Sequence, residues 1–329
     1  MRKPCQCMDA APWRARAGPR KDRRQPANAM AVGATRTELS TQTTTLGILC
    51  GVGAVVFWAA GFTAARHGID VGFTPFDILV HRFAWSALLL LPLFVRNGAA
   101  DLNGIGWGRG IMLTIFGGPV FAIVSYSGFL LVPLGHGGVI QPSCAALWGL
   151  LLATVMLRER LPPHRAIGAL IIILGLATIG GEAITTIGTH GVFGDLMFVV
   201  AGCMFGTFGM LLRLWRVDAI RATVVVSMVS FVVIPLHGLI FGFERMIALG
   251  PWENLLQAVI QGLLAGPGAI YLFTRSVVLL GAARAAVFPS LVPGFTLLVG
   301  YLALGEIPSL PQLLGFAIVL VGFRLTQKP

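Results

Sequence analysis

Residues 142–175 have the sequence PSCAALWGLLLATVMLRERLPPHRAIGALIIILG, and residues 289–322 have the sequence PSLVPGFTLLVGYLALGEIPSLPQLLGFAIVLVG. The two stretches align without a gap at an offset of 147 positions, and the same register extends outside them. Matches between leucine-rich segments are common by chance, whereas matches of proline, glutamate and glycine in one register are not. A repeat at one offset indicates a chain of two similar units. The matched pairs include Gly47 and Gly194, Ala54 and Ala201, Arg66 and Arg213, Pro142 and Pro289, Glu159 and Glu306, Gly168 and Gly315, and Gly175 and Gly322.

The composition is that of a membrane protein. Hydrophobic residues make up 56% of the 329 positions and charged residues only 11%, too few to cover the surface of a water-soluble domain of this size. The net charge of +11 does not indicate nucleic-acid binding, because that requires a folded basic face. Here eight of the basic residues lie in the first 29 positions, as a tail on an apolar body.

This tail, residues 1–45, is polar and rich in proline and alanine, and we expect it to be disordered on the cytoplasmic side. It lacks the apolar core of a signal peptide. Met30 begins a more conventional N-terminus, so we expect residues 1–29 to come from an over-extended gene start. Cys5 and Cys7 lack further ligands and the other cysteines lie in apolar segments, so we expect no metal and no disulfide.

Ten apolar runs are long enough to cross a bilayer, which needs about 20 residues per helix. We therefore predict an all-α integral membrane protein with ten transmembrane helices and no inserted soluble domain. The first five runs lie in residues 46–181 and the second five in residues 192–325. Their approximate ranges are 46–65, 75–95, 110–131, 137–157, 165–181, 192–212, 220–242, 257–280, 284–304 and 309–325.

Positive charge supports this count, because lysine and arginine accumulate in cytoplasmic loops. We predict a multi-pass protein of the inner membrane with both termini in the cytoplasm. In this orientation only Arg66 and Arg245 lie in outside loops, and Arg82 and Arg275 lie within spans. The cytoplasmic side then holds Arg96, Arg109, Arg158, Arg160, Arg165, Arg213, Arg216, Arg221, Arg284, Arg324 and Lys328. Because each half has an odd number of helices, the second half enters the membrane from the opposite face. The repeat is thus predicted to be inverted, which is the basis of alternating access.

The residues resemble the EamA family of the drug/metabolite transporter (DMT) superfamily over about residues 46–326. The resemblance rests on Trp58-Ala59-Ala60-Gly61-Phe62, on Arg82, and on the duplicated pattern Pro142, Glu159, Gly168 and Pro289, Glu306, Gly315. Relatives often have glycine and asparagine where this chain has Ala59 and Gly61. The resemblance implies export or exchange of a small metabolite through a central cavity, with both termini in the cytoplasm, and names no substrate.

Arg82 is the leading candidate for a substrate-binding residue. A charge inside the bilayer is costly, and a guanidinium facing a cavity would hold a carboxylate or another anionic group. Alternatively, Arg82 is a structural arginine tied to carbonyls or to Asp77. His81 and Asp77 lie on one face and could form a proton-responsive cluster with Arg82, although a helix cap is the simpler role for Asp77.

Other candidate binding residues are Arg275 and the flat or amide side chains Trp58, Tyr126, Gln141 and Tyr301. Arg275 lies near the end of its helix and could instead extend to the membrane surface. Most aromatic residues in such helices face lipid or a neighbour.

Glycine and proline clusters at matching places in both halves predict hinges or helix breaks near the binding site, or close helix packing. These residues are Gly117, Gly118, Pro119, Pro142, Gly266, Pro267, Gly268 and Pro289. Glu159 and Glu306 end their helices, and we expect gating or structural pairs with Arg158 or Arg160 rather than substrate contacts.

These features predict a secondary active transporter of a small metabolite, such as an amino acid-like compound or another organic anion. The alternatives are a facilitative channel and an intramembrane enzyme. Asp77 and Asp195 could be imagined as an aspartyl pair, but Asp195 is expected to cap its helix, and no catalytic motif is recognisable. No cofactor is expected. Because no phosphate-binding loop appears, proton coupling or substrate exchange is the expected energy source, and the expected partners are the substrate and membrane lipid.

Overall fold

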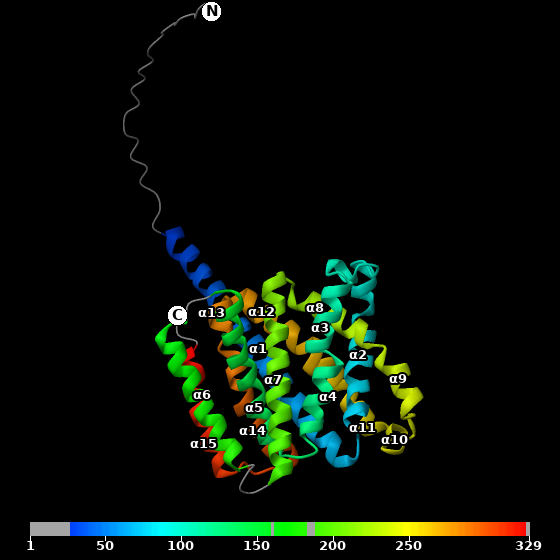
Figure 1. Ribbon diagram of the computed structural model, residues 1–329. Helices are drawn as coiled ribbons and strands as arrows, with labels where there is room; N and C mark the ends of the chain where they lie inside the picture. Colours follow the sequence, from blue (N-terminus) through cyan, green and yellow to red (C-terminus); the bar gives the residue numbers. More distant parts are fainter. Residues whose placement is uncertain (1–26, 159–160, 183–187, 327–329) are drawn as a thin grey trace, which may run out of the picture. The chain divides into compact units, whose positions relative to one another are not determined.

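The computed structural model describes residues 27–158, 161–182 and 188–326, and every element in these ranges is helical (Figure 1). Residues 1–42 and 43–329 form two separate units. The first helix, α1 (Ala27–Val71), begins well before the first expected span. The predicted disordered tail thus differs from the structure over residues 27–45, where alanine, methionine and leucine favour a helix. Residues 1–26, with Cys5, Cys7 and most of the expected extra start, lie outside the described residues.

The helices of the first half follow the expected runs, with one helix divided in two. The third expected run is broken at Gly118, whose backbone leaves the helical region. A Cβ added to Gly118 would lie 2.3 Å from the carbonyl oxygen of Thr114, so this break requires glycine. The helices after α1 are α2 (Pro75–Arg96), the short η1 (Leu102–Gly104), α3 (Trp107–Gly117), α4 (Pro119–Gly128), α5 (Leu134–Met156) and α6 (Pro163–Glu182).

The second half is more divided. Its eighth expected run, placed at 257–280, begins at Gly250 and contains the π-helical segment η3 (Ala258–Gly268), which includes Gly266, Pro267 and Gly268. The order is α7 (Thr189–Trp215), α8 (Ala219–Ser230), α9 (Val233–Ile240), α10 (Glu244–Ala248), α11 (Gly250–Gln257), η3, α12 (Ala269–Leu280), α13 (Ala282–Ala285), η4 (Phe288–Leu291), α14 (Val292–Leu304) and α15 (Leu310–Thr326).

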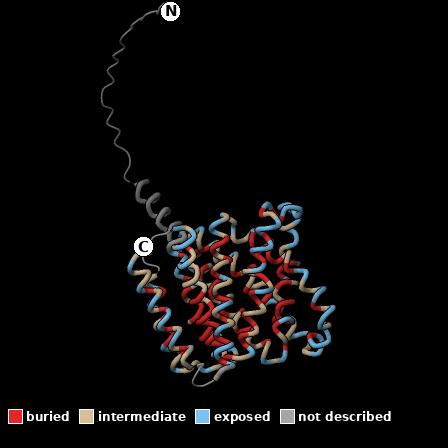
Figure 2. The backbone as a smooth tube through the Cα atoms, in the orientation of Figure 1, coloured by how far each residue is buried: buried red, intermediate tan, exposed pale blue. Residues whose placement is uncertain are grey.

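Seven helical stretches of the described chain are long and apolar enough to cross a membrane. Three further apolar helices, Pro163–Ile179, Phe288–Leu304 and Leu310–Thr326, are shorter. Together they cover the ten expected runs, and the number of transmembrane helices stays a prediction. Exposed and intermediate residues lie along the outer helices (Figure 2). Large apolar residues are among the exposed ones, such as Leu239 at 85% and Leu302 at 71%. Such a surface is suited to lipid.

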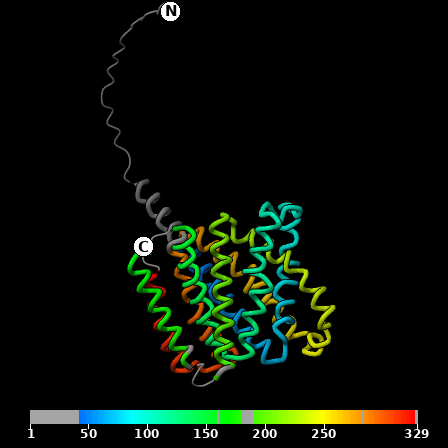
Figure 3. The backbone as a smooth tube through the Cα atoms, viewed as in Figure 1, coloured from blue at the N-terminus to red at the C-terminus, as the bar shows by residue number. Residues whose placement is uncertain are grey.

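Helices α6 and α15, the last of each half, pack closely side by side (Figure 3). A Cβ added to Gly168 would lie 2.8 Å from the oxygen of Gly322, and one added to Gly175 would lie 2.7 Å from the oxygen of Gly315. The two helices therefore run antiparallel. Gly168 thus lies against Gly322, the repeat equivalent of Gly175, and Gly175 lies against Gly315, the repeat equivalent of Gly168. This reciprocal pattern is the one expected around a two-fold axis.

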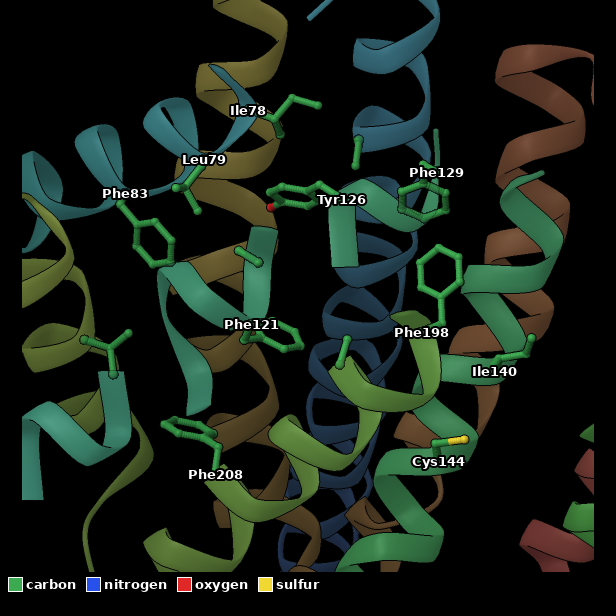
Figure 4. Close-up of a cluster of buried hydrophobic side chains, with 14 of the residues drawn as sticks. Ile78, Leu79, Phe83, Phe121, Tyr126, Phe129, Ile140, Cys144, Phe198 and Phe208 are labelled. Atoms are coloured by element: carbon green, nitrogen blue, oxygen red, sulfur yellow. The ribbon is translucent and has the colours of Figure 1, made fainter. Parts of the chain in front are cut away.

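The main apolar core lies between α2, α4, α5 and α7 (Figure 4). Phe129 and Phe198 are fully buried, with ring centroids 4.9 Å apart. Gly128 and Gly137 lie against Phe198, where an added Cβ would come within 2.7 Å and 2.6 Å of its ring. The aromatic rings fill the space that the glycines leave. In this way the fourth expected span, from the first half, packs against the sixth, from the second half.

Candidate functional site

A cavity of about 660 Å³ lies inside the unit formed by residues 43–329. Residues of both halves line it, at positions that the 147-residue offset makes equivalent. Trp58 of α1 corresponds to Phe205 of α7, and both line the cavity. So do the equivalent pairs Phe62 and Gly209, Pro142 and Pro289, and Ala145 and Val292. The cavity is thus centred where the two halves meet.

A polar group formed by Arg82, Tyr126 and Gln261 lines this cavity, and Arg82 is its cationic member. Arg82 Nη1 donates to Gln261 Oε1 at 3.4 Å, and the Tyr126 hydroxyl donates to the same oxygen at 3.0 Å. Gln261 Nε2 in turn donates to the Gly61 carbonyl at 2.7 Å, which holds η3 against α1. No carboxylate of the described residues forms an ion pair with Arg82.

A second polar pair lines the cavity next to this group. The Ser125 hydroxyl donates to Gln141 Oε1 at 2.6 Å, and both side chains are buried. Ser125 precedes Tyr126 on α4, and Gln141 precedes Pro142 on α5. The remaining wall is largely apolar and includes aromatic rings, among them Phe121 and Phe205 at a centroid distance of 5.4 Å. Around Arg82 the site therefore offers a fixed positive charge and a few amide and hydroxyl groups within apolar walls.

The structure places four of the seven candidate binding residues in the cavity, namely Trp58, Arg82, Tyr126 and Gln141. Arg275 and Tyr301 are instead exposed on the outer surface, and neither lines the cavity. For Arg275 this matches the alternative of a side chain that extends toward the membrane surface. The third exception is His81, which is buried behind the cavity wall. Its Nε2 lies 3.0 Å from Asn254 Oδ1, and its Nδ1 accepts from Trp85.

Asp77 caps α2, which is the simpler of the two roles that we considered for it from the sequence. The Thr74 hydroxyl accepts from the Asp77 amide at 3.2 Å, and the Asp77 carboxylate accepts from the Thr74 amide at 2.8 Å. Its other oxygen lies 3.1 Å from His237 Nε2 on α9. No hydrogen bond or ion pair within the described residues joins Asp77 to Arg82 or to His81, so the predicted three-residue cluster is not held by such bonds in this structure.

Asp195 does not cap its helix, contrary to expectation. The helix begins earlier, at Thr189, and this places Asp195 more than a turn inside α7. Its carboxylate lies 2.8 Å from His136 Nδ1 on α5, and both residues are buried. Asp77 and Asp195 thus belong to separate contacts with different histidines, and they do not form an aspartyl pair.

Arg66 and Glu306 form an ion pair about one helical turn beyond Phe62, which lines the cavity. Arg66 Nε donates to Glu306 Oε1 at 3.1 Å, and Arg66 Nη1 donates to the Phe129 carbonyl at 2.7 Å. Glu306 Oε2 also accepts from the Leu134 amide at 3.0 Å. Among the described residues Glu306 thus pairs with Arg66 rather than with Arg158, while its other expected partner, Arg160, lies outside the described residues. Glu159, the repeat equivalent of Glu306, also lies outside them.

The cavity reaches the opposite end of the helices. Arg165 at the start of α6, Arg213 in the last turn of α7 and Thr326 at the end of α15 all line it. Arg213 is the repeat equivalent of Arg66. Arg66 thus pairs with Glu306 outside the cavity lining, and its equivalent Arg213 lines the cavity.

Sequence reasoning missed Gln261 and Ser125 as cavity residues. A glutamine in an otherwise apolar helix indicates a polar contact with another helix. Gln257 and Gln261 are four residues apart, so they lie on the same helix face. Gln257 Nε2 donates to the Ala64 carbonyl at 2.7 Å, so both glutamines bind the backbone of α1. A Cβ at Gly61 would lie 2.6 Å from the Ala265 side chain, so a glycine permits this approach.

An all-helical chain with repeated apolar spans around one cavity belongs to the class of multi-pass membrane transporters. The EamA-like transporter family matches this chain over residues 45–181 and again over residues 192–326. The chain belongs to that family, and with it to the DMT superfamily.

Two relatives named as transporters agree with this assignment, and one solved structure shares the fold. An uncharacterized transporter of Archaeoglobus fulgidus is 26% identical over 278 residues, covering 83% of this chain and 96% of that protein. A probable terminal-alkyne amino-acid exporter of Streptantibioticus cattleyicolor is 28% identical over 283 residues, covering 83% of this chain and 91% of that exporter. One solved crystal structure, with 18% identity, shares the fold with a TM-score of 0.56 over 85% of this chain and 96% of that chain.

Proposed function

We propose that this protein is a secondary active transporter that exports or exchanges a small metabolite with an anionic group. The observation that carries the proposal is Arg82, a guanidinium in the cavity wall that forms no ion pair with a described carboxylate. Burying such a charge is costly unless something compensates it. A carboxylate on the substrate would do so through two parallel hydrogen bonds.

Alternating access between two inverted five-helix halves is the mechanism that the geometry favours. The antiparallel contact of α6 and α15 supports an inverted relation between the halves, within a fold of ten transmembrane helices. Arg66 and Arg213 are equivalent, yet one pairs with Glu306 outside the cavity lining and the other lines the cavity. Exchange of the two conformations between the halves would close the end at Arg213 and open the end at Arg66.

Hinges for this exchange would lie at the breaks in equivalent helices. Gly118 and Pro119 separate α3 from α4, and Pro267 lies in the π-helical segment η3. Pro142 lies inside the continuous helix α5, whereas its equivalent Pro289 lies in the 3₁₀ segment η4. Such irregular backbone tolerates changes of direction better than a regular helix.

The arginine distribution favours the inner membrane of a cell, with both termini in the cytoplasm. The cavity would then be open to the cytoplasm in this structure, as suits an exporter loading its substrate. The probable amino-acid exporter among the relatives suggests an amino acid-like substrate or another organic anion. A proton gradient or substrate exchange would drive transport.

Purified protein in proteoliposomes tests this function, with radiolabelled 3-phenylpropionate and phenylalanine as probes suited to aromatic walls. We expect saturable uptake of at least one probe and accelerated exchange when unlabelled probe is inside. Arg82→Gln should lower the uptake rate at low probe concentration about tenfold or more, since hydrogen bonds to charged groups contribute about 1.5–3 kcal/mol.

Arg96→Gln is the matched control, because Arg96 is an exposed arginine in the last turn of the same helix. Its uptake should equal that of the wild type. Uptake that does not saturate and shows no exchange would indicate a channel instead. Wild-type uptake by the Arg82→Gln variant would contradict the role of Arg82.

A further inference from the structure

We infer that the cavity selects organic monoanions, with a carboxylate on an apolar, preferably aromatic, body, over zwitterionic amino acids. This inference rests on the proposed function and specifies the substrate class of the same site. Three observations support it: the hydrogen-bonding atoms around Arg82 that can still bind a ligand, the positive charge of the wall, and the apolar character of the wall residues.

The polar atoms left for a ligand are mainly donors. Gln261 Oε1 already accepts from Arg82 and from Tyr126, and Gln141 Oε1 already accepts from Ser125. A guanidinium has five N–H donors, of which one at Nη1 donates to Gln261. The Gln141 amide nitrogen adds two further donors at the cavity wall. A carboxylate, which only accepts, complements this set.

The charges in the wall disfavour an ammonium group. The charged side chains among the described lining residues are Arg82, Arg165 and Arg213, all positive. An ammonium bound with its carboxylate at Arg82 would lie near a like charge, and it would lose hydration for few acceptors. The face of Trp58 offers some cation–π attraction, which is weaker than a paired carboxylate.

The walls fit an apolar body. Trp58, Phe62, Phe121 and Phe205 line the cavity, and the space of about 660 Å³ is within the range of small-molecule sites. Phe121 and Phe205 lie at an interplanar angle of 30°, and both contribute apolar surface to the cavity wall. A flat ring attached to a carboxylate by a short chain would contact both regions at once.

Three ligands that share one phenethyl body test the inference: 3-phenylpropionate, phenylalanine and phenethylamine. Their affinities are measured with wild-type protein in detergent at pH 7, by titration calorimetry. We expect 3-phenylpropionate to bind at least tenfold more tightly than phenylalanine, and phenethylamine to bind most weakly. Equal or tighter binding of phenylalanine would overturn the inference, and so would the absence of binding by all three ligands.

Two variants assign the preference to the named atoms. Arg82→Gln should weaken 3-phenylpropionate binding tenfold or more and leave phenethylamine binding unchanged or stronger. Gln141→Leu should weaken 3-phenylpropionate binding severalfold, and Arg96→Gln should have no effect. If Arg82→Gln fails to fold, as judged by gel filtration, Arg82→Lys replaces it. That variant keeps the charge without the planar fork, and unchanged 3-phenylpropionate affinity would overturn the role of Arg82.

The outcome separates this inference from the proposed function. Tight binding of the anion without saturable uptake in proteoliposomes would overturn the transporter and leave the binding preference standing. Saturable uptake of phenylalanine that 3-phenylpropionate does not compete with would overturn the substrate class and leave the transporter standing.

Discussion

Histidines and carboxylates contact one another across helices at the end of the molecule that holds Arg66 and Glu306, and the pairs of His136 and His237 are buried. His136 lies beside Asp195, His237 beside Asp77, and His67 beside Glu253 at 2.9 Å. Each contact joins elements far apart in the sequence, so these ionisable groups hold helices together in a low-dielectric interior. Arg82 differs from them because its side chain faces the cavity.

At the residue scale, Asp195→Ala should destabilise the protein, because it removes a hydrogen-bond partner of His136 Nδ1, which is buried. A lost hydrogen bond of this kind costs about 1–3 kcal/mol, and the apparent Tm in detergent should fall by several degrees. Asp195→Asn is the control, since its amide oxygen can still accept from His136. An Asp195→Ala variant with the Tm of the wild type would refute the structural role of this contact.

At the scale of the helix, the two ends of the molecule are built from equivalent elements in different arrangements. The loop after α14 carries Glu306, which joins Arg66 of α1 to the Leu134 amide at the start of α5. This contact connects the two halves at the end that holds Arg66. The contact of α6 with α15 also joins the halves, but through glycine backbones that allow no side chain between them.

Glu306→Ala should loosen this end, since it leaves both Arg66 and the Leu134 amide without this acceptor. The side chains of Arg66 and Glu306 are 23% and 28% exposed, so water weakens the effect only in part. We expect about tenfold faster hydrogen exchange in a peptide covering residues 129–136, measured by mass spectrometry. Glu306→Gln can still accept from the Leu134 amide and should give a smaller increase. Unchanged exchange in both variants would show that the pair does not hold this end together.

Gly175→Ala should destabilise the contact between α6 and α15, because the added methyl group would lie 2.7 Å from the Gly315 oxygen. Overpacking of this kind costs about 1–3 kcal/mol, and the apparent Tm should fall accordingly. Gly181 lies near the end of the same helix and has open space around an added Cβ. Gly181→Ala should therefore leave the Tm unchanged or raise it slightly. Equal Tm values for the two variants would argue against the close packing.

At the scale of the whole molecule, the arginine distribution and the inverted repeat together predict one orientation in the membrane. The loop after α2 and the loop after α9 lie on opposite sides under this prediction. The cavity reaches the side that holds Arg165 and Arg213, and the Arg66–Glu306 pair lies on the other side.

Reporter fusions test this orientation. Alkaline phosphatase fused after Gly98 should be inactive, because Gly98 is predicted to be cytoplasmic, and the same enzyme fused after Gly242 should be active outside. Green fluorescent protein at the same two positions should give the opposite pattern. Both positions reporting the same side would contradict the number of spans between them, and a complete reversal would contradict the cytoplasmic termini.

The repeat, the apolar runs, the helix break at Gly118 and the uneven arginines could be found from the sequence, because each is a local or periodic property of the chain. Which helix face points into the cavity depends on partners far away in the sequence, so only the tertiary structure decided the side-chain contacts. It brought Gln261 to Arg82 and Glu306 to Arg66, and it placed Arg275 and Tyr301 on the outside. Two arginines within spans look alike in a sequence, and the packing of the two halves around one cavity is what makes them different.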